Sequence, residues 1–288
     1  MTAARTPLFE RLIVTGPNIG GGLGVIDSGC CFFLDGFRST GICSVGDRLI
    51  VGRQPGHVVT IEAGRAEALA PEFPDIHDLA SIDGTTYAVV TTRNEVVAID
   101  ADGTTLRSWR LPGGDDACHV NCLAEWNGRV VFSLFGDFTE PRGYKGNSLE
   151  TGQIRDLETG ERIIAGLHHP HSPTPFRGGL LVADSGNAAL AVYDAGLTRV
   201  RSVPLGGYTR GIHVGATAIY VGISHSRSEG DAGPGRARLV ALDPDTFEEV
   251  GRIDLPSKEI YEVTALPDTM QPVALVTALA SLEQRISA

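Results

Sequence analysis

The residues best suited to chemistry in this 288-residue chain stand near the starts of predicted β-strands. His77, His119 and His171 carry imidazoles, which can exchange a proton near neutral pH or bind Zn²⁺, Fe²⁺ or Mn²⁺. The cofactor considered for the protein is one divalent metal, Zn, Fe, Mn or Ca. Arg210 can grip a carboxylate or phosphate through two N–H groups, and Glu262 can serve as a second acid–base group or a metal ligand. We therefore predict catalytic roles for His171, His77, Glu262 and Arg210, and a metal site at His77, His119 and His171. Structural roles stay open, including an Arg210–Glu262 ion pair.

A second group of residues is predicted to contact substrate. It consists of Arg38, Asn121, Tyr208, Tyr261, His225 and Arg227. Two long insertions, residues 135–148 and 224–238, interrupt an otherwise short-turned chain, and such loops usually carry function or are disordered. We expect them to form partial lids that bring Asp137, Arg142, His225 and Arg227 over the site.

The elements that would position these side chains repeat with a period of roughly 40 to 50 residues. Each unit contains a short strand, a tight Asp-Gly, Asn-Gly or Arg-Gly-Gly turn, a second strand with alternating apolar residues, and two further strands. Four antiparallel strands per unit are typical of a propeller blade. First strands are expected near Gly41, Asp78, Cys122, Ser172, Gly211 and Glu262. The pattern predicts an all-β, six-bladed β-propeller; an open β-sandwich is the alternative.

The two ends of the chain are predicted to complete one blade together. The C-terminal unit is short of strands, while the N-terminus supplies strands with no first strand of their own. We expect a single domain over residues 1–288, with about 9–36 and 260–278 sharing the closing blade and 279–288 as a frayed or helical tail. In such a ring, residues before each first strand share one channel mouth with the loops between second and third strands, so His77 and His171 take equivalent positions.

Composition narrows the possible partners. The formal net charge of −11 and the pI near 5.2 argue against nucleic-acid binding, which depends on clustered Lys and Arg. The sequence has no apolar window of membrane-spanning length and no secretory leader pattern, so we expect no membrane contact and a cytoplasmic location. Residues 16–25, GPNIGGGLGV, lack the ending of a phosphate-binding loop, so no nucleotide cofactor is expected. The five cysteines are expected to be reduced thiols.

Several motifs resemble those of one known family. They are Pro-His-Ser-Pro at 170–173, Asp-Ser-Gly at 184–186, Gly-Tyr-Thr-Arg-Gly at 207–211 and Tyr-Glu-Val at 261–263. Together they resemble an uncharacterised bacterial β-propeller family, in which the last motif carries Asp where this chain has Glu262. At fold level the chain also resembles streptogramin lyase and gluconolactonase-type propellers. That likeness implies a divalent metal and acid–base groups at the channel mouth, although their metal ligands cannot be matched residue by residue.

The main functional hypothesis is an enzyme acting on a small polar or anionic molecule. It would work by His-mediated acid–base or metal-assisted chemistry, as a lyase, isomerase or cyclase in bacterial specialised metabolism. A metal-dependent hydrolase of a lactone or ester is one alternative. A non-catalytic propeller that binds a ligand or a protein is the other. The sequence indicates no particular oligomeric state.

Overall fold

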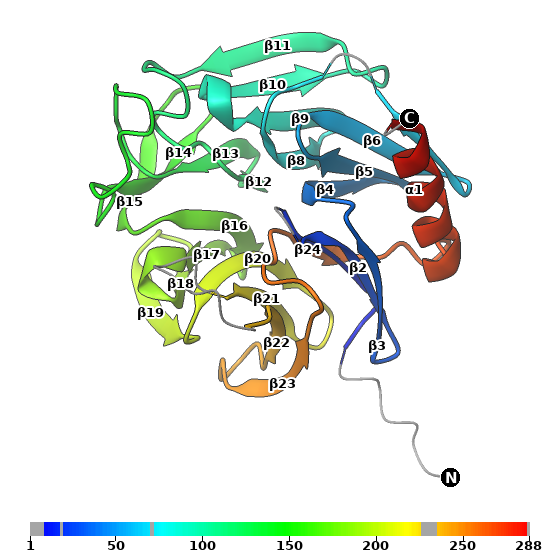
Figure 1. The fold of residues 1–288 in the computed structure, drawn as a ribbon. Coiled ribbons are helices and arrows are strands. Elements are labelled where there is room, and N and C mark those ends of the chain that lie inside the picture. The colour runs from blue at the N-terminus through cyan, green and yellow to red at the C-terminus, as the bar shows by residue number, and fades with distance from the viewer. Residues whose placement is uncertain (1–8, 18–19, 70–71, 226–234, 287–288) are drawn as a thin grey trace.

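The computed structural model describes residues 9–17, 20–69, 72–225 and 235–286. Six four-stranded antiparallel sheets are arranged in a ring around a central channel (Figure 1). The predicted six-bladed β-propeller is therefore confirmed. No helix in these ranges is both long and apolar enough to cross a membrane.

Five blades follow one another along the chain, each with its first strand innermost. Blade one holds β4 (Ser39–Val45), β5 (Arg48–Arg53), β6 (His57–Glu62) and β7 (Arg65–Ala68). Blade two holds β8 (Ile76–Ile82), β9 (Thr85–Val90), η1 (Thr91–Arg93), β10 (Glu95–Ile99) and β11 (Thr105–Arg110). Blade three holds β12 (Leu123–Trp126), β13 (Arg129–Leu134), β14 (Gly152–Asp156) and β15 (Arg162–Leu167).

Blades four and five have the same plan. Blade four holds β16 (Pro170–Phe176), β17 (Gly179–Asp184), η2 (Ser185–Asn187), β18 (Ala189–Tyr193) and β19 (Arg199–Pro204). Blade five holds β20 (Tyr208–Val214), β21 (Ile219–Ser224), β22 (Arg238–Leu242) and β23 (Glu249–Asp254). The first hairpins turn where the sequence predicts: Asn127 and Gly128 both adopt positive φ, 51° and 72°, as a type I′ turn requires.

The closing blade joins the two ends of the chain. It consists of β24 (Val263–Ala265), β1 (Leu12–Thr15), β2 (Gly22–Asp27) and β3 (Cys30–Asp35), with Ile13 opposite Thr264 across the antiparallel β1–β24 pair. This confirms closure by N-terminal strands. The expected extent of the C-terminal part is wrong, because only three of its residues are strand and helix α1 (Pro272–Ile286) follows.

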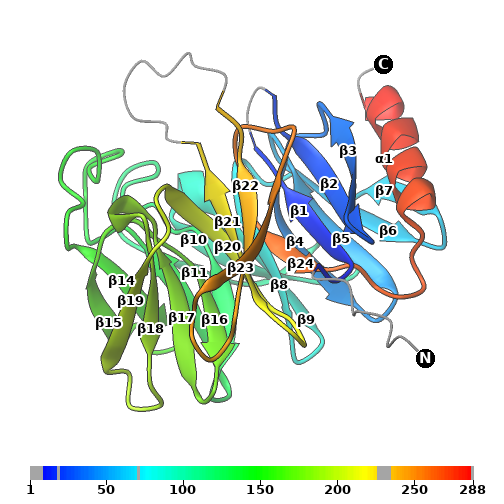
Figure 2. The ribbon, with the colours of Figure 1, turned by 90° about the horizontal axis from the view of Figure 1, so that it is seen from below.

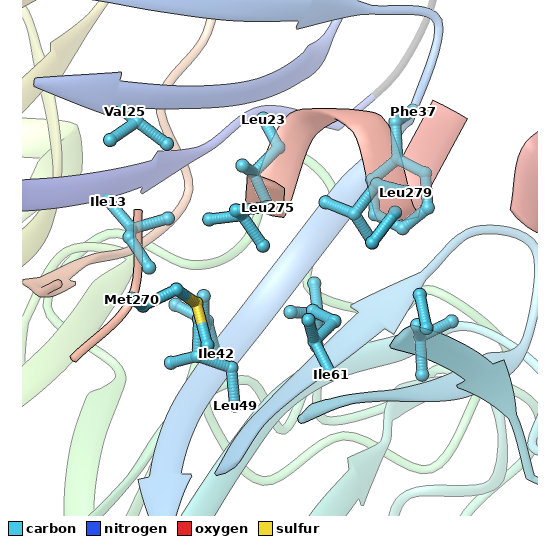
Figure 3. Packing of buried hydrophobic residues seen from close by; sticks show 14 of the residues in the cluster. Ile13, Leu23, Val25, Phe37, Ile42, Leu49, Ile61, Met270, Leu275 and Leu279 are labelled. Atoms are coloured by element: carbon cyan, nitrogen blue, oxygen red, sulfur yellow. The ribbon is translucent and has the colours of Figure 1, made fainter. Parts of the chain in front are cut away.

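Helix α1 covers the outer side of the closing blade and blade one (Figure 2). Its buried residues Leu275, Leu279 and Leu282 recur at helical spacing, which the strand repeat obscured at the sequence level. Leu275 and Leu279 pack with Ile13, Leu23, Phe37, Leu49 and Ile61 from the two blades (Figure 3). Arg53 pairs with Glu283 of α1 at 2.5 Å, so the helix fastens the seam where the ring closes.

The inner strands are irregular at their starts. Pairing with the second strand shifts register between Ser39 and Ile42, between Ile76 and Asp78, between His171 and Thr174, and between Arg210 and Ile212. Bulges of this kind re-aim side chains and are common beside functional sites. Polar side chains at these bulges reach the next blade: Thr40 donates its hydroxyl to the Ile76 carbonyl at 2.6 Å, and the Asp78 carboxylate accepts from Leu123 N at 2.7 Å.

Candidate active site at the channel mouth

A cavity of about 370 Å³ opens where the inner strands begin. We call it the mouth cavity. It is lined by Pro17, Arg38, Thr40, Gln54, Pro55, Asp75, His77, Asp116, His119, Arg142, Tyr144, Lys145, Arg210 and Tyr261. These residues come from strand starts and from loops between second and third strands, such as Gln54 and Pro55 between β5 and β6.

Two Asp–His pairs lie side by side on its wall. His77 Nε2 lies 3.2 Å from Asp75 Oδ1, and His119 Nδ1 lies 2.8 Å from Asp116 Oδ1. The two imidazole rings meet edge to face, with centroids 5.0 Å apart. Asp116 and His119 both have left-handed backbone, with φ of 53° and 49°, a conformation that costs energy outside glycine and clusters at functional sites.

Burial and charge act differently on the two pairs. Burial alone would raise the pKa of Asp75, but the hydrogen bond from His77 and the positive potential of the imidazoles lower it to about 2. Burial lowers the pKa of His119 to about 4, against the raising effect of Asp116. His119 is therefore neutral at physiological pH, and Asp75 is ionised.

Arg210 lines the mouth cavity and packs against two tyrosine rings. Its guanidinium carbon sits 4.9 Å from the Tyr208 ring centre and 5.0 Å from that of Tyr261, within cation–π range. Its Nη1 is 3.6 Å from a Glu259 oxygen. The ion pair with Glu262 considered from the sequence is replaced by this one with Glu259.

Three buried polar atoms around the mouth cavity have no hydrogen-bond partner within the described ranges. They are His77 Nδ1, Arg210 Nε and the Tyr261 hydroxyl oxygen. Burial raises the pKa of Tyr261 well above its usual range, so the phenol keeps its proton and can donate it in a hydrogen bond. Unpartnered buried polar atoms cost free energy, and their grouping at one cavity indicates a place built for a polar ligand.

His171 is close to this group but lies behind it. A second cavity, of about 560 Å³, adjoins the mouth cavity. The His171 side chain is fully buried and lines neither of the two cavities in the described structure. Nδ1 lies 2.8 Å from Ser185 Oγ and 3.0 Å from the His169 carbonyl. Because Ser185 donates its own proton to the Thr209 carbonyl at 2.5 Å, Nδ1 must be protonated, which leaves Nε2 with a lone pair. Burial and Arg210 lower the pKa of His171 well below its usual range.

Residues 72–275 match the family described as a domain of unknown function, DUF4915. The chain belongs to this family. The resemblance expected from the motifs is thereby confirmed, and no curated protein matches the DUF4915 chain.

Solved structures show how widely this fold is used. One is a protein of unknown function from Bacteroides caccae, with TM-score 0.63, 12% identity, and coverage of 88% of this chain and 98% of that one. A structure described as a gluconolactonase has TM-score 0.58, 18% identity, and coverage of 78% and 81%. A streptogramin B lyase has TM-score 0.50, 16% identity, and coverage of 76% and 69%. At these identities the likeness shows the fold of the DUF4915 chain alone.

Glu262 lies one layer below the mouth. It lines a third space of about 430 Å³ further along the channel, together with Asp78 and Ser172. Glu262 Oε1 accepts a hydrogen bond from Val263 N at 3.0 Å, and Oε2 accepts one from the Ser172 hydroxyl at 3.2 Å. Burial and the nearby Asp78 raise its pKa well above the usual range.

Of the other residues predicted to contact substrate, some line one of the two cavities and others do not. Arg38 and Tyr261 line the mouth cavity, and Tyr208 lines the adjoining one. The Asn121 amide is buried and bonded to the His119 carbonyl and to Ser133, and among the described residues it lines neither cavity. His225 donates its backbone N–H to Lys258 and likewise lines neither of them. Arg227 lies outside the described residues.

The first insertion contributes to the site, although not through all of its expected residues. Arg142 lines the mouth cavity, 3.3 Å from Asp116. Tyr144 donates its hydroxyl to Asp116 at 2.9 Å, which the sequence analysis missed. Asp137 instead pairs with Arg155 at 2.6 Å and Arg162 at 3.1 Å. Asp75 and Asp116 were missed too, although an Asp two or three residues before a His is a signal that could have found them.

The three histidines predicted as metal ligands do not form a metal centre. Among the described residues, no group of three or more His, Cys, Asp or Glu side chains is placed to hold a metal ion. His77 and His119 each direct one nitrogen at an aspartate. The Phe135 ring lies against both His119 and His171, with centroids 4.2 Å and 5.4 Å away. The three imidazoles are therefore not arranged as the expected tri-histidine site within the described ranges, although an Asp–His contact by itself is compatible with a metal ligand.

Proposed function

We propose that the protein is an enzyme that moves protons on a small anionic molecule bound at the channel mouth. His77 and His119 act as the acid–base pair, and Arg210 binds the anion. The observation that carries this proposal is the contact between two Asp–His pairs beside buried polar atoms that have no partner in the described structure. The proposal shifts the chemistry from His171, whose ring lies behind the cavity, to His119.

In each pair the carboxylate orients the imidazole. Asp75 accepts the Nε2–H of His77, which leaves Nδ1 as a proton acceptor. Asp116 accepts the Nδ1–H of His119, which leaves Nε2 as an acceptor. This is the arrangement by which a carboxylate fixes the tautomer of a general base.

The ring contact favours same-face chemistry. Two imidazoles with centroids 5.0 Å apart share one wall of the cavity, so they cannot approach one substrate carbon from opposite faces. One imidazole takes a proton from the carbon next to a carboxylate. The electron pair of the broken C–H bond is then shared with the carboxylate as an enolate. The other imidazole, which enters the cycle with a proton on both nitrogens, then protonates the far carbon of a C=C bond conjugated with the enolate, as in an isomerase, or a leaving oxygen on the same face as its C–O bond breaks, as in a syn elimination. The proton held by the first imidazole passes to solvent, and solvent reprotonates the second. Arg210 and the Tyr261 hydroxyl would stabilise the enolate-like charge.

Proton exchange in D₂O tests this function. Purified protein is incubated with a panel of small 2-hydroxy, 3-hydroxy and β,γ-unsaturated carboxylates, each with a C–H bond next to the carboxylate, and loss of that C–H signal is followed by ¹H NMR. We expect exchange or conversion of a substrate, reduced about 10²- to 10⁴-fold in His77→Gln and in His119→Gln. His57→Gln is the matched control, because His57 lies on β6 beside Glu72, outside the mouth cavity. Undiminished exchange in a variant that combines His77→Gln and His119→Gln would exclude these two histidines as the acid–base pair. Binding of a carboxylate without exchange would favour a propeller that only binds a ligand.

A further inference from the structure

A second cavity of about 560 Å³ adjoins the mouth cavity. We call it the aromatic cavity; its walls include Phe135, His168, His169 and Tyr208. The two cavities share His119, Tyr144, Lys145 and Arg210, so they form two lobes of one space with these residues at the junction. Each lobe falls within or near the size range of small-molecule sites, about 300–1,000 Å³.

The walls of the aromatic cavity suit a flat ring. Phe135 and His169 are stacked, with centroids 4.2 Å apart and an interplanar angle of 19°. Tyr208 stands 6.0 Å from His169 at an angle of 58°. Burial lowers the pKa of His169 to about 4, so this imidazole is an uncharged aromatic surface at neutral pH. Aromatic walls of this kind bind flat rings by offset and edge-to-face contact.

Charge separates the two lobes. The mouth cavity contains Asp75 and Asp116, whereas no carboxylate lines the aromatic cavity among the described residues. The cations that face the aromatic cavity, Lys145 and Arg210, are both at the junction. A positively charged substituent would therefore be disfavoured in the aromatic cavity, and an anion is favoured where the two lobes meet.

We propose that the substrate is a carboxylate that carries an uncharged aromatic or conjugated ring. The ring enters the aromatic cavity, the carboxylate lies between Lys145 and Arg210, and the carbon next to it faces the His77 and His119 rings. This assignment names the substrate class for the proposed function and rests on it, but the binding site can be tested without any turnover.

The test compares three probes by isothermal titration calorimetry: trans-cinnamate, crotonate, which replaces the ring by a methyl group, and cinnamyl alcohol, which lacks the anion. We expect cinnamate to bind on the order of ten-fold more tightly than either relative, as burial of a ring and of a paired anion predicts. Tyr208→Ala should weaken cinnamate on the order of ten-fold more than crotonate, because both acids lose the packing of Tyr208 on Arg210 but only cinnamate loses a ring contact. Lys145→Ala should weaken both acids and leave the alcohol unchanged.

Two control variants make the same substitutions, Tyr to Ala and Lys to Ala, at other positions of the chain. Tyr87→Ala removes a tyrosine that packs on Trp109 in blade two, and Lys258→Ala removes the other lysine of the chain. Neither should alter cinnamate binding. Should Tyr208→Ala fail to fold, NOEs from the cinnamate ring protons to Phe135 and Tyr208 in the unmodified protein give the same decision. Equal affinity for cinnamate and crotonate, or NOEs elsewhere, would overturn the assignment. Cinnamate binding without exchange on any aryl carboxylate would refute the proposed function while leaving the site intact.

Discussion

The mouth of the channel and the layer beneath it both bury ionisable side chains from strand starts. The two regions differ in how many of these polar atoms have a hydrogen-bond partner. In the mouth, polar atoms of His77, Arg210 and Tyr261 lack partners among the described residues. In the layer beneath, Asp78 accepts hydrogen bonds from Leu79 N at 2.8 Å and Leu123 N at 2.7 Å. Both oxygens of each buried carboxyl in this layer are used.

This difference in hydrogen bonding distinguishes residues that hold the blades together from residues that can bind a ligand. Asp78 of blade two holds the backbone of blade three, and Ser172 of blade four connects the closing blade to blade five through Glu262 and Gly211 N. These bonds cross blade boundaries, so they hold the ring together. The mouth residues leave donors and acceptors available to a ligand instead. Satisfied buried groups support the fold, whereas unsatisfied ones mark the site.

The largest expected effect is a loss of stability when the hydrogen bonds of the layer beneath the mouth are removed. Asp78→Ala leaves two buried N–H groups, those of Leu79 and Leu123, without their acceptor. Each orphaned group costs about 1–3 kcal/mol, so we expect the free energy of unfolding to fall by about 3 kcal/mol. Denaturant unfolding measures it. Asp254→Ala, at an exposed carboxylate on β23, should change it by less than about 0.5 kcal/mol. An equal, small effect of both variants would show that the layer is not structural.

The second expected effect is a dependence of stability on pH. Burial and Asp78 raise the folded-state pKa of Glu262, and burial raises that of Asp78 to about 7. A carboxyl with a raised folded-state pKa gives its full stabilisation below its unfolded pKa and loses it as pH rises through the folded value. We therefore expect stability to fall between about pH 4.5 and 7, by up to about 1.4 kcal/mol per pH unit for each such proton.

Glu262→Gln sharpens this test, because an amide has no proton to lose. Thermal unfolding between pH 5 and 8 should show a flatter profile for Glu262→Gln than for the unmodified chain. Glu249→Gln, at an exposed position on β23, is the control and should keep the original slope. Parallel profiles for Glu262→Gln and the unmodified chain would mean that Glu262 is ionised in the folded protein throughout.

The fold was predictable because its signals are local and repeated. Turn pairs such as Asn127-Gly128 mark each hairpin, and the surplus of N-terminal strands indicated how the ring closes. The helical alternative for the tail at 279–288 covers only the second half of the C-terminal helix. Its first half was missed because residues 272–278 sit in a segment that the repeat had assigned to the closing blade.

The sequence predicted where the site lies better than it predicted which residues form it. Alignment of strand starts places His77 at the mouth, where it does lie. The same alignment treats His171 as equivalent, and both strands carry a bulge beside the histidine, yet the bond from His171 to Ser185 holds its ring behind the cavity. Asp116 and Tyr144 come from irregular loops, whose conformation depends on left-handed backbone that no strand repeat encodes.

The smallest expected effects compare one hydroxyl from each region. Ser172→Ala removes a buried hydroxyl that donates to Glu262 and accepts from Gly211 N, and should lower the free energy of unfolding by about 1–2 kcal/mol. Tyr261→Phe removes a buried hydroxyl with no partner in the described structure, so it should leave stability unchanged or raise it by up to about 1 kcal/mol. Denaturant unfolding of both variants gives the comparison. If Tyr261→Phe proved as destabilising as Ser172→Ala, the phenol would be a structural group, and the mouth would lose one of the three atoms that mark it as a binding site.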